Sequence, residues 1–339
     1  MNKEIHLFYI GSYLHLIVAD GIISKKQLPL EDVLFVTYRG VKLPSCYADN
    51  LLYDESKIRA SRFVIKNFLW LKRKLKRRRV CGYFPFQGQF PVMKYYDRYV
   101  FFEEGLSAYE SSMEYSRCNK EVFFKILLKK ILLYPFIGRK INGILNGRLN
   151  GSPFPINCTL VGLSDQSYKN VVIDNCKHET IPVSSRPLNK SSIHDSVIIV
   201  MDSTHATDRM ESVDNYLTIL SEVIKGIDIN SKKVYLKLHP DNFKDMDAAL
   251  DQIKNYIGFI NFNVIDESLE DIALSNQNNL FIGTHSTALF YAPIFGNTNR
   301  AVSFSRIYAS RDAVYANWLL PWGGIDGFLT LFKQHIECL

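Results

Sequence analysis

Residues 280–295 have the sequence Leu-Phe-Ile-Gly-Thr-His-Ser-Thr-Ala-Leu-Phe-Tyr-Ala-Pro-Ile-Phe. The apolar run Leu280–Ile282 predicts a short strand, and residues 286–295 predict a helix that follows it after a sharp turn. A strand that leads directly into a helix is the repeating unit of parallel sheets. This stretch therefore indicates an α/β fold, and the same pattern recurs elsewhere in the chain.

The second half of the chain repeats this alternation. Further strands are predicted at Ser196–Met201, Lys233–Leu238, Phe262–Ile265 and Ala301–Phe304, with helices near 210–226, 243–257 and 267–275. Regular alternation of this kind implies βαβ units and a parallel sheet.

The first half shows a less regular mixture of strands and helices. A strand at Ile5–Ile10 leads through Gly11-Ser12 into an amphipathic helix at Tyr13–Ile23. The other predicted elements are strands at Val33–Thr37, Tyr99–Phe102, Leu160–Leu163 and Val171–Ile173, and helices at Ile58–Lys76 and Glu121–Leu133.

The length of 339 residues suits two domains. The best linker is the proline- and serine-rich stretch 181–192. We expect Rossmann-like domains at 1–182 and 193–312, and a helical segment at 313–339 that packs back on the N-terminal domain. Two such domains facing across a cleft match the arrangement of nucleotide-sugar glycosyltransferases, although fold alone does not fix chemistry.

The net charge of +7 is unevenly distributed. One short segment holds seven basic side chains: Lys72, Arg73, Lys74, Lys76, Arg77, Arg78 and Arg79. This run favours a polyanionic partner or an anionic membrane surface, and the basic-apolar stretch Phe123–Lys140 could share that role. The alternatives are a solvated helix end and a core helix with exposed lysines. No recognised nucleic-acid-binding motif is present, and lysines interrupt the only long apolar stretch, so a membrane span is not expected.

The six cysteines are scattered and form no Cys-x-x-Cys pair, so neither a zinc site nor a disulfide framework is indicated. A reducing cytoplasm is the simplest setting. The first residues, Met1–His6, make a poor signal peptide and fit a first strand better.

Glu103-Glu104-Gly105 follows the predicted strand Tyr99–Phe102. Two adjacent carboxylates repel each other, so at least one pKa should rise, which suits a general base. Gly105 permits a tight turn at this strand end. The alternative is a solvated corner between a strand and a loop.

His239-Pro240 ends the predicted strand Lys233–Leu238. A protonated histidine at this edge of the sheet could stabilise or protonate a departing phosphate. Lys237 is expected to point to the opposite face from its neighbours. The alternative is a histidine that caps a surface turn.

Residues Gly283-Thr284-His285-Ser286-Thr287 open the helix that follows the strand Leu280–Ile282. Free backbone N–H groups and hydroxyls at a helix N-terminus form an anion site. The alternative is an ordinary helix cap. For His285 we favour a structural role.

Other carboxylates lie near predicted strand ends. Asp266-Glu267 could accept hydrogen bonds from ribose hydroxyls or could be helix N-terminal charges, and Asp202-Ser203-Thr204 could line the same cleft. Asp245-Met246-Asp247 has the form of a metal-binding Asp-x-Asp motif, but it falls at the start of a polar helix. No cluster has convincing metal-ligand spacing, so no metal cofactor is expected.

Taken in order, the three motifs resemble those of bacterial sialyltransferases, most closely the polysialyltransferase and lipooligosaccharide sialyltransferase families. Phe102-Glu103-Glu104-Gly105, Leu238-His239-Pro240 and Ser286-Thr287 match in order, and the resemblance spans roughly residues 100–290. The motif is Glu-Glu where some relatives have Asp-Asp, and Thr287 stands in place of a serine. Neither change removes the required chemical group.

The resemblance implies a GT-B fold and inverting, metal-independent transfer of sialic acid, or a related nonulosonic acid, from its CMP donor. Glu104 would be the base, assisted by Glu103, and His239 would act on the CMP phosphate. The N-terminal domain would hold the acceptor and the C-terminal domain the donor. The implied donor site consists of Ser286, Thr287, Pro240, Asp266, Glu267, Gly283 and Thr284.

The resemblance also implies a cellular setting. The acceptor would be a bacterial surface glycan, in a capsule or lipooligosaccharide. The protein would then lie in the cytoplasm, held peripherally on anionic lipid of the inner membrane.

Two other functions are compatible with the sequence. One is a GT-B transferase with another activated donor, such as CMP-Kdo or a nucleoside diphosphate sugar. The other is a non-catalytic protein with a degenerate GT-B fold that binds polyanions or membranes.

Overall fold

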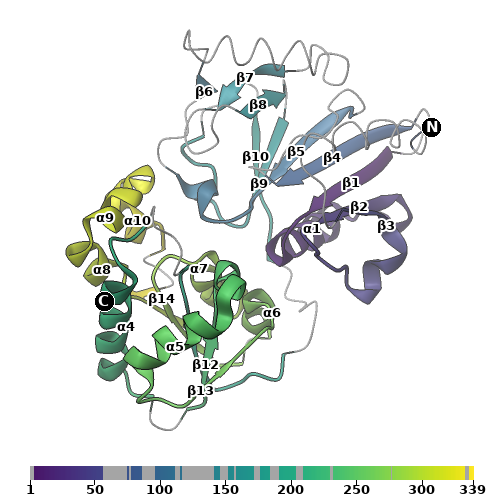
Figure 1. The fold of residues 1–339 in the computed structure, drawn as a ribbon. Helices are drawn as coiled ribbons and strands as arrows, with labels where there is room; N and C mark the ends of the chain where they lie inside the picture. Colours follow the sequence, from purple (N-terminus) through teal and green to yellow (C-terminus); the bar gives the residue numbers. More distant parts are fainter. Residues whose placement is uncertain are drawn as a thin grey trace. The chain divides into compact units, whose positions relative to one another are not determined.

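The chain forms two compact units, Met1–Ser184 and Ser185–Leu339. The computed structural model describes residues 4–55, 75, 78–85, 96–110, 115–116, 141–145, 152–155, 158–171, 176–183, 191–203, 209–229, 232–275, 277–332 and 336–339. The boundary between the units lies within the proline- and serine-rich stretch 181–192. Each unit has its own apolar core. Each also has its own parallel sheet (Figure 1).

A parallel sheet forms the centre of the first unit. Its described strands are ordered β10-β9-β5-β4-β1-β2-β3. They are β1 (Glu4–Ile10), β2 (Val33–Tyr38), β3 (Leu51–Glu55), β4 (Arg79–Pro85), β5 (Arg98–Phe102), β9 (Cys158–Gly162) and β10 (Lys177–Thr180). β1 pairs with both β2 and β4, and nearly all of its side chains are buried. A strand covered on both faces needs such a continuous apolar run.

Helix α1 (Tyr13–Lys26) follows β1 directly. Its N-cap Ser12 accepts a hydrogen bond from the backbone N–H of His15, and Gln27 ends it in the left-handed conformation. The helix is buried on nearly all sides between Leu14 and Ile23, so it is more enclosed than the predicted amphipathic helix. The described part of this unit also contains three short 3-10 helices: η1 (Leu30–Asp32), η2 (Ser45–Asn50) and η4 (Leu106–Tyr109).

The second unit contains a sheet with Rossmann-like strand order. Its described strands are ordered β13-β12-β11-β14-β15-β16. They are β11 (Val197–Val200), β12 (Val234–Lys237), β13 (Phe262–Val264), β14 (Leu280–Gly283), β15 (Arg300–Ser303) and β16 (Ile336–Cys338). The chain runs outward from β11 through β12 to β13 and then crosses to β14 on the other side of β11. In open α/β sheets, ligands bind at such a switch point, beyond the carboxyl ends of the strands.

The helices of the second unit follow the predicted alternation closely. They are α4 (Val213–Gly226), α5 (Met246–Ile257), α6 (Leu269–Leu274), α7 (Thr287–Phe295), α8 (Ser305–Arg311), α9 (Ala313–Trp318) and α10 (Gly324–Phe332), with 3-10 helices η5 (Pro240–Asp245) and η6 (Leu320–Trp322). Ser212 and Asp245 cap α4 and α5 through their side chains. α7 is apolar on all sides and is mostly buried; its Phe290 ring lies 5.0 Å from that of Phe328 in α10.

The structure differs from the prediction at several places in the first unit. β3 and β4 were not predicted; β4 begins within the basic run, and the pair Cys81-Gly82 interrupts its apolar pattern. Val171 lies outside any strand, and the following strand is β10 instead. A small antiparallel sheet formed by β6 (Tyr115–Ser116), β7 (Ile141–Leu145) and β8 (Ser152–Pro155) was also missed.

Some predicted elements lie wholly or largely outside the described residues. These are the helix at Glu121–Leu133, almost all of the helix at Ile58–Lys76, Val172 and Ile173 of the predicted strand, and the whole stretch Phe123–Lys140. Among the described helices, none has both the length and the hydropathy that a bilayer-crossing segment needs.

The C-terminal segment 313–339 was predicted to be helical. It contains α9 and α10, but it ends in β16, which pairs in parallel with β15. Its observed packing therefore includes the sheet of the second unit. Additional packing on the N-terminal domain stays a prediction.

Candidate active site

The two carboxylates after β5 lie in different environments. Glu103 is fully buried, and its Oε2 accepts hydrogen bonds from the backbone N–H of Leu163 at 2.8 Å and from Ser167 Oγ at 2.7 Å. Its own backbone N–H donates to Val161, in the neighbouring strand β9. Glu103 thus joins the carboxyl ends of β5 and β9.

Burial raises the pKa of Glu103 to about 7, although hydrogen bonds from Leu163 and Ser167 act in the opposite direction. The predicted rise of one pKa in the pair is therefore present at Glu103. Its main cause is burial, whereas the sequence analysis attributed it to repulsion between the two carboxylates.

Glu104 is half-buried and lies in the turn that follows β5. Burial raises the pKa of Tyr38, at the end of β2, and the nearby charge of Glu104 adds to that rise. The guanidinium of Arg39 lies 5.7 Å from the centre of the Tyr38 ring. Gly105 has φ 138°, a conformation that favours glycine, and so confirms the predicted tight turn. Glu104 is therefore the accessible carboxylate of the pair.

The turn between β1 and α1 supports this edge of the sheet. A Cβ atom at Gly11 would lie 2.2 Å from the Tyr38 ring, so this close approach needs glycine. The backbone N–H of Gly11 donates to His15 Nδ1 at 3.0 Å, and the His15 ring lies 5.5 Å from that of Phe102. Burial lowers the pKa of His15 to about 3, so this histidine is neutral and structural. Tyr38 and His15 were not among the predicted site residues; their positions beside strand ends were the available signal.

His239 follows β12 and is half-buried. Its backbone carbonyl accepts a hydrogen bond from the N–H of Asn242, whose side-chain Nδ2 donates to the carbonyl of Asp202 at 3.3 Å. The ends of β12 and β11 are thereby linked. Pro240, the other residue of this motif, is the first residue of η5.

Lys237 points away from the buried residues Leu236 and Leu238, as predicted. Its Nζ donates to the backbone carbonyls of Ile265, Asp266 and Glu267, the last at 2.8 Å. Lys237 therefore holds the loop between β13 and α6. Within this loop, Asp266 and Glu267 are exposed, and Glu267 accepts a hydrogen bond from Ser191 Oγ at 2.6 Å.

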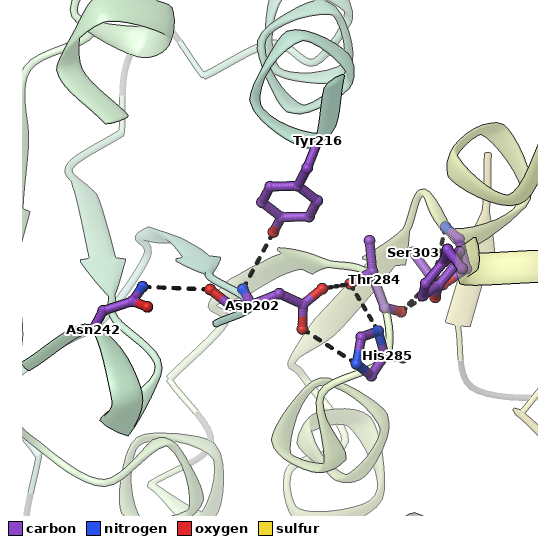
Figure 2. A network of polar contacts seen from close by, with 8 residues as sticks. Asp202, Tyr216, Asn242, Thr284, His285 and Ser303 are labelled. Atoms are coloured by element: carbon purple, nitrogen blue, oxygen red, sulfur yellow. Dashed lines mark hydrogen bonds and ion pairs between the residues drawn. The ribbon is translucent and has the colours of Figure 1, made fainter. Parts of the chain in front are cut away.

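A buried polar network occupies the switch point between β11 and β14 (Figure 2). The Asp202 carboxylate accepts a hydrogen bond from Thr284 Oγ1, and its Oδ1 lies 3.3 Å from His285 Nε2. The His285 ring also packs against Trp318, with 4.2 Å between the ring centres. Arg209, which the sequence analysis missed together with Trp318, has its guanidinium 5.5 Å from the centre of the Trp318 ring.

Ser286 and Thr287 follow this network and are half-buried. Ser286 is the N-cap residue of α7, but its side chain makes no capping hydrogen bond within the described structure. The ordinary-cap alternative is therefore wrong for its hydroxyl. Gly283 has a packing role, because a Cβ there would lie 3.0 Å from the Val200 carbonyl oxygen. Thr284 is buried, so it supports the turn from behind.

The described residues contain no group of three or more histidine, cysteine or acidic side chains that could hold a metal. Asp245 accepts a hydrogen bond from the backbone N–H of Ala248 and so acts as the N-cap of α5. That role agrees with the rejection of Asp245-Met246-Asp247 as a metal motif. Of the basic run, Arg78 and Arg79 are described and exposed. Its other members, Lys72, Arg73, Lys74, Lys76 and Arg77, lie outside the described residues.

Comparisons with known proteins bear on both fold and family. A family model described as alpha-2,8-polysialyltransferase (POLYST) matches residues 92–304, more than half of the chain. This span includes Glu103-Glu104-Gly105, His239-Pro240 and Ser286-Thr287. A search of curated protein sequences returns no match.

Two solved structures are similar over nearly the whole chain. A sialyltransferase from Photobacterium damsela has 10% sequence identity and a TM-score of 0.50, with 99% of this chain and 81% of that chain covered. A putative UDP-N-acetylglucosamine 2-epimerase from Listeria monocytogenes has 11% identity and a TM-score of 0.51, with coverage of 99% and 92%. At this identity the likeness shows the fold alone, and it confirms the predicted GT-B class.

Proposed function

The chain belongs to the alpha-2,8-polysialyltransferase family, and we propose from that premise that it transfers sialic acid from a CMP-activated donor to a sialylated glycan. It is a glycosyltransferase that transfers sialyl groups. The CMP donor, the acceptor, the stereochemistry and the independence from metal belong to the proposal. The family description names α-2,8 linkage, so the proposed acceptor group is the 8-hydroxyl of a terminal sialic acid.

One observation carries the proposal: all three motifs lie at the carboxyl ends of parallel strands. Glu104 follows β5, His239 follows β12, and Ser286 follows β14. β5 belongs to the sheet of the first unit and β12 and β14 to that of the second, and ligands of open α/β sheets bind at the carboxyl ends of their strands. A base, a histidine and a helix N-terminus at strand ends are the groups that sialyl transfer without a metal would need.

Glu104 is the proposed base. Its half-buried carboxylate takes the proton of the acceptor hydroxyl, whose oxygen then forms a bond to the anomeric carbon of the donor sugar. The Glu103 carboxylate accepts hydrogen bonds from the Leu163 backbone N–H and the Ser167 hydroxyl, so its proposed role is to hold the backbone of the pair in place. Glu104 is then the residue that takes the proton.

The leaving group is CMP, which departs with the electron pair of the broken bond between the anomeric carbon and the phosphate oxygen. His239 stabilises or protonates the phosphate, and the hydroxyls of Ser286 and Thr287 and the N–H groups of α7 bind it. These groups neutralise a single phosphate, so the step needs no metal. A single displacement of this kind inverts the configuration of the anomeric carbon.

A donor screen tests the proposal. The purified chain is incubated with a labelled oligosialic acid acceptor and one donor at a time: CMP-sialic acid, CMP-Kdo or a UDP-sugar. The masses of the products are measured by mass spectrometry. The proposal expects extension by sialyl residues with CMP-sialic acid alone. Extension with a different donor, or with none of them, would overturn the proposed donor.

A further inference from the structure

We infer that Asp202 is a positioning residue for donor binding: through Thr284 and His285, it fixes the turn that carries Ser286 and Thr287. This inference rests on the proposed function, since it assumes that this turn binds the donor phosphate. Asp202 itself is only 6% exposed and is the second residue after β11.

Asp202 is held firmly enough to act as an anchor. Its backbone N–H donates to the Tyr216 hydroxyl at 3.3 Å, and its carbonyl accepts from Asn242 Nδ2 at 3.3 Å. These contacts tie it to helix α4 and to the segment after His239 (Figure 2). The Asp202 carboxylate contacts the turn after β14, through Thr284 and His285.

The opposite side of the turn is held by hydroxyl groups. The carbonyl of Thr284 accepts hydrogen bonds from Ser303 Oγ at 2.8 Å and from Ser305 Oγ at 2.7 Å. Ser305 Oγ in turn accepts from the Tyr315 hydroxyl at 2.9 Å. With its side chain bonded to Asp202 and its carbonyl bonded to two serines, Thr284 cannot rotate without breaking several hydrogen bonds.

Asp202, Thr284 and His285 form a closed ring of three polar contacts. Besides the two contacts of the carboxylate, Thr284 Oγ1 lies 3.2 Å from His285 Nδ1. Three hydrogen bonds need three hydrogens; a carboxylate supplies none and a hydroxyl supplies one. The ring is complete when both nitrogens of His285 carry hydrogen, and the imidazolium charge then offsets the carboxylate.

The residues of the ring are proposed to position the turn, whereas the two residues that follow it are proposed to bind the donor phosphate. Thr284 and His285 are 1% and 5% exposed, whereas the next two residues, Ser286 and Thr287, are half-buried. Because the Thr284 peptide lies so close to the start of α7, its displacement also moves the N–H groups and hydroxyls proposed to bind phosphate. A displacement of about 1 Å can cost on the order of 100-fold in rate.

Thr284→Val tests the inference, because valine keeps the shape of threonine but removes the hydroxyl from two contacts of the ring. CMP is titrated into each variant by calorimetry, and KM for CMP-sialic acid and for the acceptor are measured separately. The inference predicts that the Kd for CMP and the donor KM rise about tenfold or more, while the acceptor KM stays unchanged. Thermal unfolding without CMP verifies that each variant is folded at the assay temperature.

The matched variant Thr284→Ser retains the hydroxyl and should preserve CMP binding to within about threefold. If Thr284→Val does not fold, Ser305→Ala removes one of the two bonds to the Thr284 carbonyl and should raise the Kd severalfold.

The results distinguish this inference from the proposed function. Unchanged CMP affinity in Thr284→Val, or in Ser305→Ala where that variant replaces it, would overturn the positioning role while wild-type transfer stands. A wild-type protein that neither binds CMP nor uses CMP-sialic acid would overturn both.

Discussion

Glu103 and Glu104 are adjacent in sequence but differ in burial: Glu103 is fully buried and accepts hydrogen bonds from the backbone N–H of Leu163 and from the Ser167 hydroxyl. Glu104 is half-buried, and its charge adds to the rise in the pKa of Tyr38 at the end of β2 in the same sheet. The pair therefore combines a structural carboxyl with an accessible one.

The first prediction concerns the base. Glu104→Gln should lower kcat by about 100-fold or more, because the amide cannot take the proton of the acceptor hydroxyl. CMP affinity should stay unchanged, since the donor phosphate is assigned to the second unit. The matched control is Glu103→Gln, which should keep activity within about tenfold. Full activity in Glu104→Gln together with an inactive Glu103→Gln would reverse the assignment.

The second prediction concerns pH and stability. The pKa of Glu103 is raised from its ordinary value of 4.5 to about 7 by burial, so the folded protein binds this proton more tightly than the unfolded chain. This residue's contribution to stability should therefore fall as pH rises from about 4.5 to about 7 and then level off, by an amount on the order of 3 kcal/mol.

Glu103→Gln has no such titration, so the pH dependence of its Tm between pH 5 and 8 should be flatter than that of the wild type. Thermal unfolding across this range measures the difference. Parallel curves for the two proteins would show that Glu103 does not titrate in this way.

Much of the fold and the family could be predicted from the sequence. The strands around 100, 234 and 280 are short apolar runs beside polar turns, and the motifs at Glu103, His239 and Ser286 mark their carboxyl ends. The predicted sialyltransferase resemblance and GT-B fold are confirmed by the family match and the solved structures.

The sequence could not show which of the two glutamates is buried and which is accessible. It also could not reveal the ring of contacts at Asp202. Both depend on contacts between residues far apart in the chain, such as Glu103 with Ser167 and Asp202 with Thr284. β4 was missed because a buried parallel strand has no alternating pattern and Gly82 interrupts its apolar run.

The third prediction concerns metal. Transfer should continue in EDTA, because His239 and the N-terminus of α7 are proposed to neutralise the phosphate. Initial rates with and without EDTA provide the measurement. Complete loss of activity that magnesium or manganese restores would contradict the proposed metal-independent step.

The fourth prediction concerns the basic run, of which Arg78 and Arg79 are exposed. Replacement of Arg77, Arg78 and Arg79 by glutamine should weaken binding to anionic lipid vesicles more than transfer to a short acceptor, because each charge contributes roughly 1 kcal/mol near such a surface. Wild-type binding should fall as salt rises. Unchanged vesicle binding with loss of long anionic acceptors alone would make the run a glycan-binding surface, and no change in either would make it a solvated helix end.

Proton NMR of a single reaction provides the most direct test of the central claim, which is direct displacement of CMP by the acceptor hydroxyl. With CMP-sialic acid, whose sugar is β-linked, and an oligosialic acid acceptor, the first product should be α-linked and should form together with an equal amount of CMP. A β-linked first product, or release of CMP without formation of a new glycosidic bond, would contradict the account.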